Sequence, residues 1–119
     1  MLPKQGHLLR IFIGERHQYG RVPLYQWIVK KARERGLAGA TVLRGLMGFG
    51  AKSHVHTAKI LRLSSDLPVV IEIVDTMEKI EAFLPEIDEA IGHGLATIEK
   101  VEVRFLKGRR GLVPCSLIP

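Results

Sequence analysis

The stretch GATVLRGLMGFGAKSHVHTAKI, residues 39–60, is the segment around which the rest of the chain is organised. Its first half alternates and is β-branched enough to predict a strand. The strand leads through Gly48, Phe49 and Gly50 into a basic segment, and glycines let a ligand approach the backbone without a Cβ in the way. An anion site is a reasonable hypothesis here, although a tight turn or bulge between two strands explains the glycine spacing better.

Strand-like and helix-like patterns follow one another along the chain. Alternating apolar residues predict strands, and apolar residues at helical spacing predict helices. In order, we predict a strand at 7–15, a loop at 16–21, a helix at 23–35, the strand that starts at 39, its hairpin return at 57–63, a strand at 67–74, a helix at 75–91 and a strand at 95–106.

The two predicted helices carry signals at their ends. Pro23 suits the first turn of the first helix, and Gly36 suits the position just after its end. In the second helix, Asp75 and Glu78 have the spacing of a capping box. Pro85 should kink this helix or weaken one of its turns.

The order β-α-β-β-α-β predicts an α+β, ferredoxin-like fold, in which a four-stranded antiparallel sheet carries both helices on one face. Residues 67–74 nevertheless supply apolar side chains to both faces: Val69, Ile71 and Ile73 to one, Val70 and Val74 to the other. An uncovered apolar face is unfavourable in water by ~25 cal/mol per Å². We therefore expect other subunits to cover this face, which makes the protein a homo-oligomer.

Length and composition indicate one soluble domain. The 119 residues predict a single domain with its core at about 7–107 and an irregular tail at 108–119. No apolar run approaches the ~20 residues that span a bilayer, and no signal-peptide pattern is present. The single cysteine, Cys115, cannot form an internal disulfide, which fits a reducing compartment. We expect a cytoplasmic protein.

The net charge of +6 and the pI of about 9.8 raise the question of nucleic-acid binding. The basic residues are scattered, however, and neither an aromatic single-strand platform nor zinc-finger spacing is present. We expect no specific nucleic-acid binding. Non-specific binding, which salt would abolish steeply, is a weaker hypothesis.

Histidines are the main candidates for metal binding or catalysis. His54 and His56 could form half of a metal site, but a solvated or phosphate-facing pair is the better interpretation because no cysteine or carboxylate adjoins them. No nucleophile elbow, Walker loop or dinucleotide fingerprint is present. We find no catalytic constellation and expect no metal site and no required cofactor.

Four blocks of sequence, in order, carry a resemblance to a known family: LRIFIGE, PLYQWIVKKARERGLAGATVLRGLMGFG, HTAKILRLSSDLPVVIEIVD and EKIEAFLPEI. The resemblance extends over roughly residues 8–105. The chain resembles the PII-like signalling proteins and, more specifically, the uncharacterised PII-like domain family with DUF number 190. The resemblance implies a homotrimer that binds adenine nucleotides in clefts between subunits. It also implies that a loop docks on a regulated protein, with a membrane transporter as one candidate partner.

The resemblance also implies which residues bind the nucleotide. Thr41 would lie near the base, Glu72 and Val74 would line the base pocket, and the glycine-rich turn after the second helix would offer backbone amides to the phosphates. The full set is Thr41, Gly48, Phe49, Gly50, Glu72, Val74, Gly92, His93, Gly94 and Leu95, with Arg104 and Lys107 as candidate cations.

The chain departs from PII proteins in two respects. The loop that would meet the partner is short and has no tyrosine; it comprises Ala51, Lys52, Ser53, His54, Val55 and His56. The basic residues that grip a triphosphate have no secure counterpart after Gly94. We therefore expect AMP or ADP as the effector rather than ATP. A small enzyme that acts on a nucleotide or phosphorylated substrate through His54, His56 or His93 is the alternative.

Overall fold

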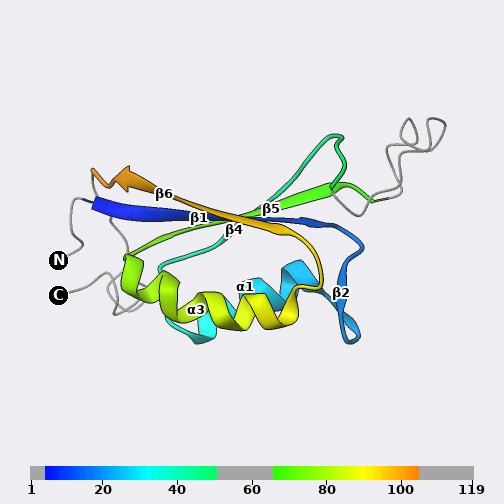
Figure 1. The fold of residues 1–119 in the computed structure, drawn as a ribbon, viewed down its shortest axis with the longest axis horizontal. Coiled ribbons are helices and arrows are strands. Elements are labelled where there is room, and N and C mark those ends of the chain that lie inside the picture. The colour runs from blue at the N-terminus through cyan, green and yellow to red at the C-terminus, as the bar shows by residue number, and fades with distance from the viewer. Residues whose placement is uncertain (1–4, 51–65, 105–119) are drawn as a thin grey trace.

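A four-stranded sheet carries two helices on one face in the computed structural model, which describes residues 5–50 and 66–104 (Figure 1). The elements of this layer pair are β1 (Gln5–Gly14), α1 (Leu24–Glu34), β4 (Thr41–Arg44), β5 (Pro68–Asp75), α3 (Met77–Ala90) and β6 (Leu95–Glu102). The sheet order is β4-β5-β1-β6, and all neighbours are antiparallel. The predicted ferredoxin-like fold is confirmed.

Strand β1 lies at the centre of the sheet. It pairs with β5 from His7↔Asp75 to Gly14↔Pro68, and with β6 from Gln5↔Glu102 to Phe12↔Leu95. The prediction that the last strand runs to residue 106 is wrong, because β6 ends at Glu102, opposite the first residue of β1.

Strand β4 is shorter than the alternation of residues 39–50 suggests. Its ladder ends at Arg44↔Val69, next to the start of β5 at Pro68, whose nitrogen has no hydrogen to donate. The predicted hairpin return at 57–63 lies outside the described residues.

Apolar side chains from both layers meet between the sheet and the helices. They are Leu9, Ile11 and Ile13 of β1, Val69, Ile71 and Ile73 of β5, Leu24, Ile28 and Ala32 of α1, Ile80, Phe83, Ile87 and Ala90 of α3, and Leu37. The β5 part of this core, Val69, Ile71 and Ile73, is one of the two faces predicted for residues 67–74. Burying these side chains is what fixes the two helices against the sheet.

The end of α1 has the geometry that its sequence predicts. Gly36 has φ +75°, a left-handed conformation that suits glycine. Its N–H donates to the Arg33 carbonyl, and the Leu37 N–H donates to the Ala32 carbonyl. This pair of bonds is a Schellman motif, so Gly36 is confirmed as the residue that ends the helix.

The predicted capping box at Asp75 is wrong. Thr76 caps α3, and its side-chain oxygen accepts the Lys79 N–H at 3.3 Å. Asp75 cannot be the cap because it is the last residue of β5, paired with His7. Its fully buried carboxylate instead accepts the N–H of Ala38 at 3.0 Å and the N–H of Thr76 at 2.6 Å. Asp75 thereby joins the segment after α1 to the start of α3.

The segment at 16–21 is more ordered than the predicted loop. It contributes to a small two-stranded ribbon, β2 (Gln18–Tyr19) and β3 (Val22–Pro23), with Gly20 in its turn at φ +63°. Pro23 is the residue before the helix rather than part of its first turn, since α1 starts at Leu24. None of the helices in the described part of the chain is long and apolar enough to cross a membrane.

The other face of the sheet carries no helix (Figure 1). The β1 residues Leu8 and Phe12 lie on this open face, opposite Val74 and Val70 of β5, and Val74 is 37% exposed. At the centre of the face, Arg10 donates from Nε to Glu72 at 2.9 Å and from a terminal nitrogen to Glu99. One guanidinium thus ties β5, β1 and β6 together across an apolar surface.

Candidate functional site

Several turns of the chain lie together at one end of the sheet, where β4 and β1 end and β5 and β6 begin. The Gly45 N–H donates to the Pro68 carbonyl at 2.6 Å, and a Cβ on Gly45 would lie 2.6 Å from the Pro68 ring. Arg44, the last residue of β4, pairs with Glu15 at 2.7 Å. The segment after β4 therefore folds closely over the start of β5, and glycine is required there because no side chain fits.

The turn between α3 and β6 lies at the same end of the sheet. A Cβ on Gly94 would lie 2.5 Å from the Ile91 side chain and 2.9 Å from the Phe12 carbonyl, so only glycine allows this approach to β1. Gly92 is different: a Cβ there would meet only the His17 ring, at 3.8 Å. Its backbone is open to a ligand, and exposed amides in such turns are suited to anions.

His17 and His93 stack on each other at this turn. Their ring centroids are 4.6 Å apart with an interplanar angle of 12°. The Nδ1 atom of His17 is buried and has no hydrogen-bond partner among the described residues. Burial lowers the pKa of His17 below its ordinary value, the neighbouring His93 lowers it further, and Asp66 partly opposes both effects. His17 is therefore held largely neutral at pH 7.

Asp66 holds the segment between β1 and β2 in place. Its carboxylate accepts the Arg16 N–H at 3.0 Å. The same carboxylate fills the space beside Gly14, where a Cβ would lie 2.7 Å from it. Asp66 therefore positions the chain that carries His17.

The predicted nucleotide-binding residues fall into two groups in one chain. Gly48, Phe49 and Gly50 follow β4 at one edge of the sheet, whereas the Gly92–Leu95 turn precedes β6 at the opposite edge. Strands β5 and β1 lie between them, so the edges are roughly 14 Å apart at three inter-strand spacings. The two groups share one end of the sheet but do not contact each other within a subunit. A site in which the two groups contact each other would need edges from two subunits.

The predicted base-pocket residues lie on the open face. Thr41 is the Cα partner of Glu72 across β4 and β5. Glu72 pairs with Arg10, and Val74 lies further along β5 toward the opposite end of the sheet. The three share one face of one strand pair, although the carboxylate of Glu72 already has a cation partner.

Arg104 is far from the glycine-rich turn. It follows β6, at the end of the sheet where Gln5 pairs with Glu102, and its guanidinium donates to Glu102 at 3.1 Å. The eight residues of β6 separate it from the turn. Lys107 and the predicted partner loop, residues 51–56, lie outside the described residues.

Sequence reasoning missed three residues at these surfaces. His17 falls in the predicted loop at 16–21, Asp66 falls just before the predicted strand at 67–74, and Arg10 falls in the predicted strand at 7–15, and none of the three was given a role. The alternation of β1 does place Arg10 on the open face, and a charge in the middle of an apolar strand is a usable signal. No local pattern could pair His17 with His93, because the contact joins distant parts of the chain. Within the described residues, no group of three or more His, Cys, Asp or Glu side chains could hold a metal ion.

Comparison with known proteins shows the family. The DUF190 family model, described as an uncharacterized ACR, matches residues 6–103. The chain belongs to the DUF190 family. This DUF190 protein is 46% identical over 99 residues to a UPF0166 protein of Aquifex aeolicus (strain VF5), covering 83% of this chain and 93% of the relative. It is 37% identical over 100 residues to a UPF0166 protein of Methanocaldococcus jannaschii, covering 83% of this chain and 92% of that relative.

Solved structures similar to this DUF190 protein are PII-like. A protein from Thermus thermophilus, described as a PII-like signaling protein, superimposes with a TM-score of 0.60 at 17% identity, over 87% of this chain and 93% of that one. CPII from Thiomonas intermedia K12, bound to ADP, AMP and acetate, superimposes with a TM-score of 0.56 at 18% identity, over 92% and 94%. The fold is therefore that of PII-like proteins.

Proposed function

We propose that this DUF190 protein is a regulatory protein of the PII-like type, which binds an adenine nucleotide between subunits of a homotrimer and controls a protein partner. The observation that carries the proposal is the position of the two glycine-rich segments, at one end of the sheet but on opposite edges. The similar fold of CPII, which is described with ADP and AMP bound, supports the same conclusion.

The Gly92–Leu95 turn is the proposed phosphate-binding segment. The room beside Gly92 leaves its backbone amides accessible, and no lysine or arginine lies in this turn to neutralise a triphosphate. This favours ADP or AMP over ATP. The base would contact Thr41, Glu72 and Val74 near the subunit boundary, with Gly48, Phe49 and Gly50 at the root of the partner loop. Residues 51–56 would then carry the nucleotide state to the partner, for which a membrane transporter is one candidate.

Calorimetric titration with AMP, ADP and ATP tests the proposal. We expect one ADP or AMP per subunit, and we expect Gly92→Val to weaken binding at least tenfold, by about 1.4 kcal/mol or more, because its side chain blocks the amides. Gly39→Val is the matched control: a Cβ on Gly39 also has free space, but Gly39 lies outside the proposed site. Equal binding by both variants, or no binding by the wild-type trimer, contradicts the nucleotide site.

The same samples separate a regulator from an enzyme. A regulator returns the nucleotide intact after prolonged incubation, whereas an enzyme that acts through His54, His56 or His93 converts it to product. Chromatography of the nucleotide after titration therefore decides between the two classes. Conversion that is lost in His93→Gln would overturn the regulatory proposal.

A further inference from the structure

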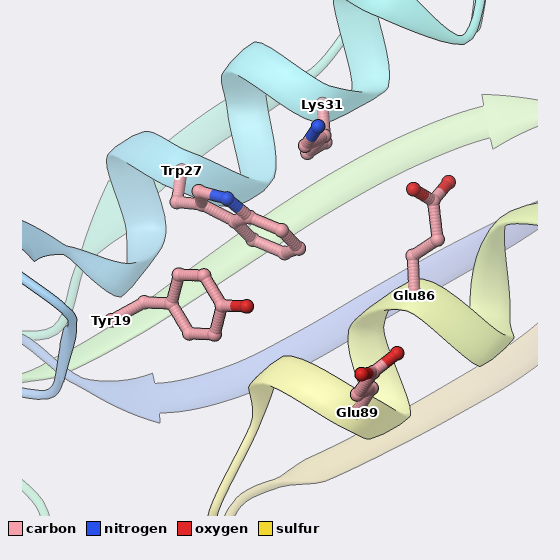
Figure 2. Close-up of a pocket in the computed structure, with 5 residues that line it drawn as sticks. All are labelled: Tyr19, Trp27, Lys31, Glu86 and Glu89. Atoms are coloured by element: carbon pink, nitrogen blue, oxygen red, sulfur yellow. The ribbon is translucent and has the colours of Figure 1, made fainter.

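A pocket of about 180 Å³ lies on the helical side of the molecule, between α1, α3 and the β2 strand (Figure 2). It is lined by Tyr19, Trp27, Lys31, Glu86 and Glu89. None of these residues belongs to the proposed nucleotide site, and the pocket is complete within one subunit.

Two aromatic rings form one wall of the pocket. The centroids of Tyr19 and Trp27 are 4.6 Å apart, with the rings tilted by 43°. The Lys31 ammonium already lies over the Trp27 ring, 5.8 Å from its centroid. Aromatic faces attract cations through their quadrupole, and indole does so most strongly. The two ring faces therefore suit an ammonium group, and an added ammonium would share the Trp27 ring with Lys31.

The opposite wall supplies negative charge from α3. Glu86 is neutralised by Arg35, which donates to both of its carboxylate oxygens at 2.6 Å. Lys31 is neutralised by Glu34 at 3.3 Å. Glu89 is exposed, and among the described residues it has no ion-pair or hydrogen-bond partner. One lysine and two glutamates line the pocket, which gives it a formal charge of −1. The unpaired negative charge is that of Glu89, because Glu86 and Lys31 each have an ion-pair partner.

We propose that this pocket binds a primary alkylammonium group, as carried by a free diamine or by a lysine side chain. Such a group has three N–H donors. Figure 2 shows the Tyr19 hydroxyl pointing from the aromatic wall toward α3, the helix that carries Glu89. In the proposed complex, the Tyr19 hydroxyl and the Glu89 carboxylate accept two of the hydrogen bonds. The third N–H is left to solvent, because both oxygens of Glu86 accept from Arg35. The alkyl stem packs on Trp27.

Trp27 is the single tryptophan of the chain, so its fluorescence reports directly on the pocket. The full-length protein is titrated with 1,4-diaminobutane at constant ionic strength, and separately with N-acetyl-lysine N-methylamide. We expect a saturable fluorescence change with the diamine and none with 1,4-butanediol, which lacks the charge. A comparable response to the lysine amide assigns the ligand to a polypeptide side chain; a response to the diamine alone assigns it to a free amine.

Three variants sharpen this test. Glu89→Gln keeps the shape of the side chain but removes the unpaired charge, and should weaken binding about tenfold. Lys31→Met removes the ammonium that competes for the Trp27 ring, and should strengthen binding severalfold. Asp88→Asn, at an exposed neighbouring position outside the pocket, is the matched control and should bind like wild type.

A non-saturable response to the diamine, or equal affinity in Glu89→Gln and Asp88→Asn, overturns the proposal. The outcome is independent of the nucleotide site. The diamine titration requires no nucleotide, and the variants of this pocket leave the Gly92–Leu95 turn unchanged.

Discussion

Asp75 is the residue on which two segments of the fold depend. Its carboxylate is fully buried and accepts two backbone N–H groups, one after α1 and one at the start of α3. A buried N–H that loses its partner costs its full desolvation penalty. The side chain therefore contributes more to stability than the surface ion pairs, whose net contribution is small.

We expect Asp75→Ala to lower the free energy of unfolding by about 3 kcal/mol, which is the summed cost of leaving the N–H groups of Ala38 and Thr76 buried without an acceptor. Asp75→Asn, which keeps one acceptor oxygen, should lose less. Urea denaturation of both variants and of Asp88→Ala, an exposed control on α3, measures the difference. If Asp75→Ala and Asp88→Ala unfold at the same urea concentration, the two hydrogen bonds do not support the fold as described.

At the scale of elements, the strongest patterns were predicted and the short ones were not. The alternation in β1 and β5 and the helical spacing in α3 each extend over enough residues to identify the element and its buried face. The ribbon of β2 and β3 was missed because two-residue strands have no period. The α3 cap was placed one residue early because Asp75 and Thr76 are both good caps, and only the pairing of Asp75 with His7 decides between them.

The candidate site was harder to predict than the fold. The resemblance predicts Gly94 only as a phosphate-binding glycine, and its close approach to β1 appears only in the structure. The His17–His93 stack joins two turns separated by most of the chain. The separation of the two glycine-rich segments depends on the order of the strands in the sheet, which no local residue pattern gives and which follows only from the predicted fold. The residue types of the candidate site could therefore be predicted, but not which of them lie close together.

The two turns that carry His17 and His93 should respond to acid as a unit. The pKa of His17 in the folded chain lies below its ordinary value of 6.5, through burial and the nearby His93. In the unfolded chain His17 takes up a proton first, so the stability of the fold decreases as the pH falls through 6.5 toward the folded pKa. Well above pH 6.5, His17 is neutral in both the folded and the unfolded chain, so its contribution to the free energy of unfolding does not change with pH.

Proton NMR titration of the histidine rings tests this prediction, with the His17 signal assigned from His17→Gln. We expect His17 to titrate below 6.5 in the wild type and closer to 6.5 in His93→Gln, which removes one of the two causes. His7→Gln, in β1, should leave the His17 midpoint unchanged. A His17 midpoint at or above 6.5 in the wild type would contradict the described packing.

For the whole molecule, the open face of the sheet determines the expected assembly. One face is covered by α1 and α3, and the other exposes apolar side chains around the Arg10, Glu72 and Glu99 cluster. If the subunits associate through this face, a negative charge placed there has to be buried beside Glu72 and Glu99, whose two carboxylates already share the single Arg10 guanidinium. Such burial costs several kcal/mol per ion.

We expect Val74→Glu to dissociate the oligomer, raising its dissociation constant by at least roughly 100-fold, while leaving the fold intact. Analytical ultracentrifugation gives the mass, and circular dichroism checks the fold. Gln26→Glu, at an exposed position on α1, adds the same charge to the covered side and is the matched control. A Val74→Glu protein with unchanged mass would show that the subunits meet elsewhere.

The position of the two glycine-rich segments on opposite edges of the sheet has a genetic consequence. In the proposed ring of subunits, each nucleotide site would take one edge from each of two neighbours, so every subunit would contribute to two sites and complete neither alone. We therefore expect a chain damaged only after β4 and a chain damaged only before β6 to be inactive as pure assemblies. When the two are co-expressed, mixed rings would contain interfaces at which both intact edges meet, and we expect complementation between the alleles to restore function.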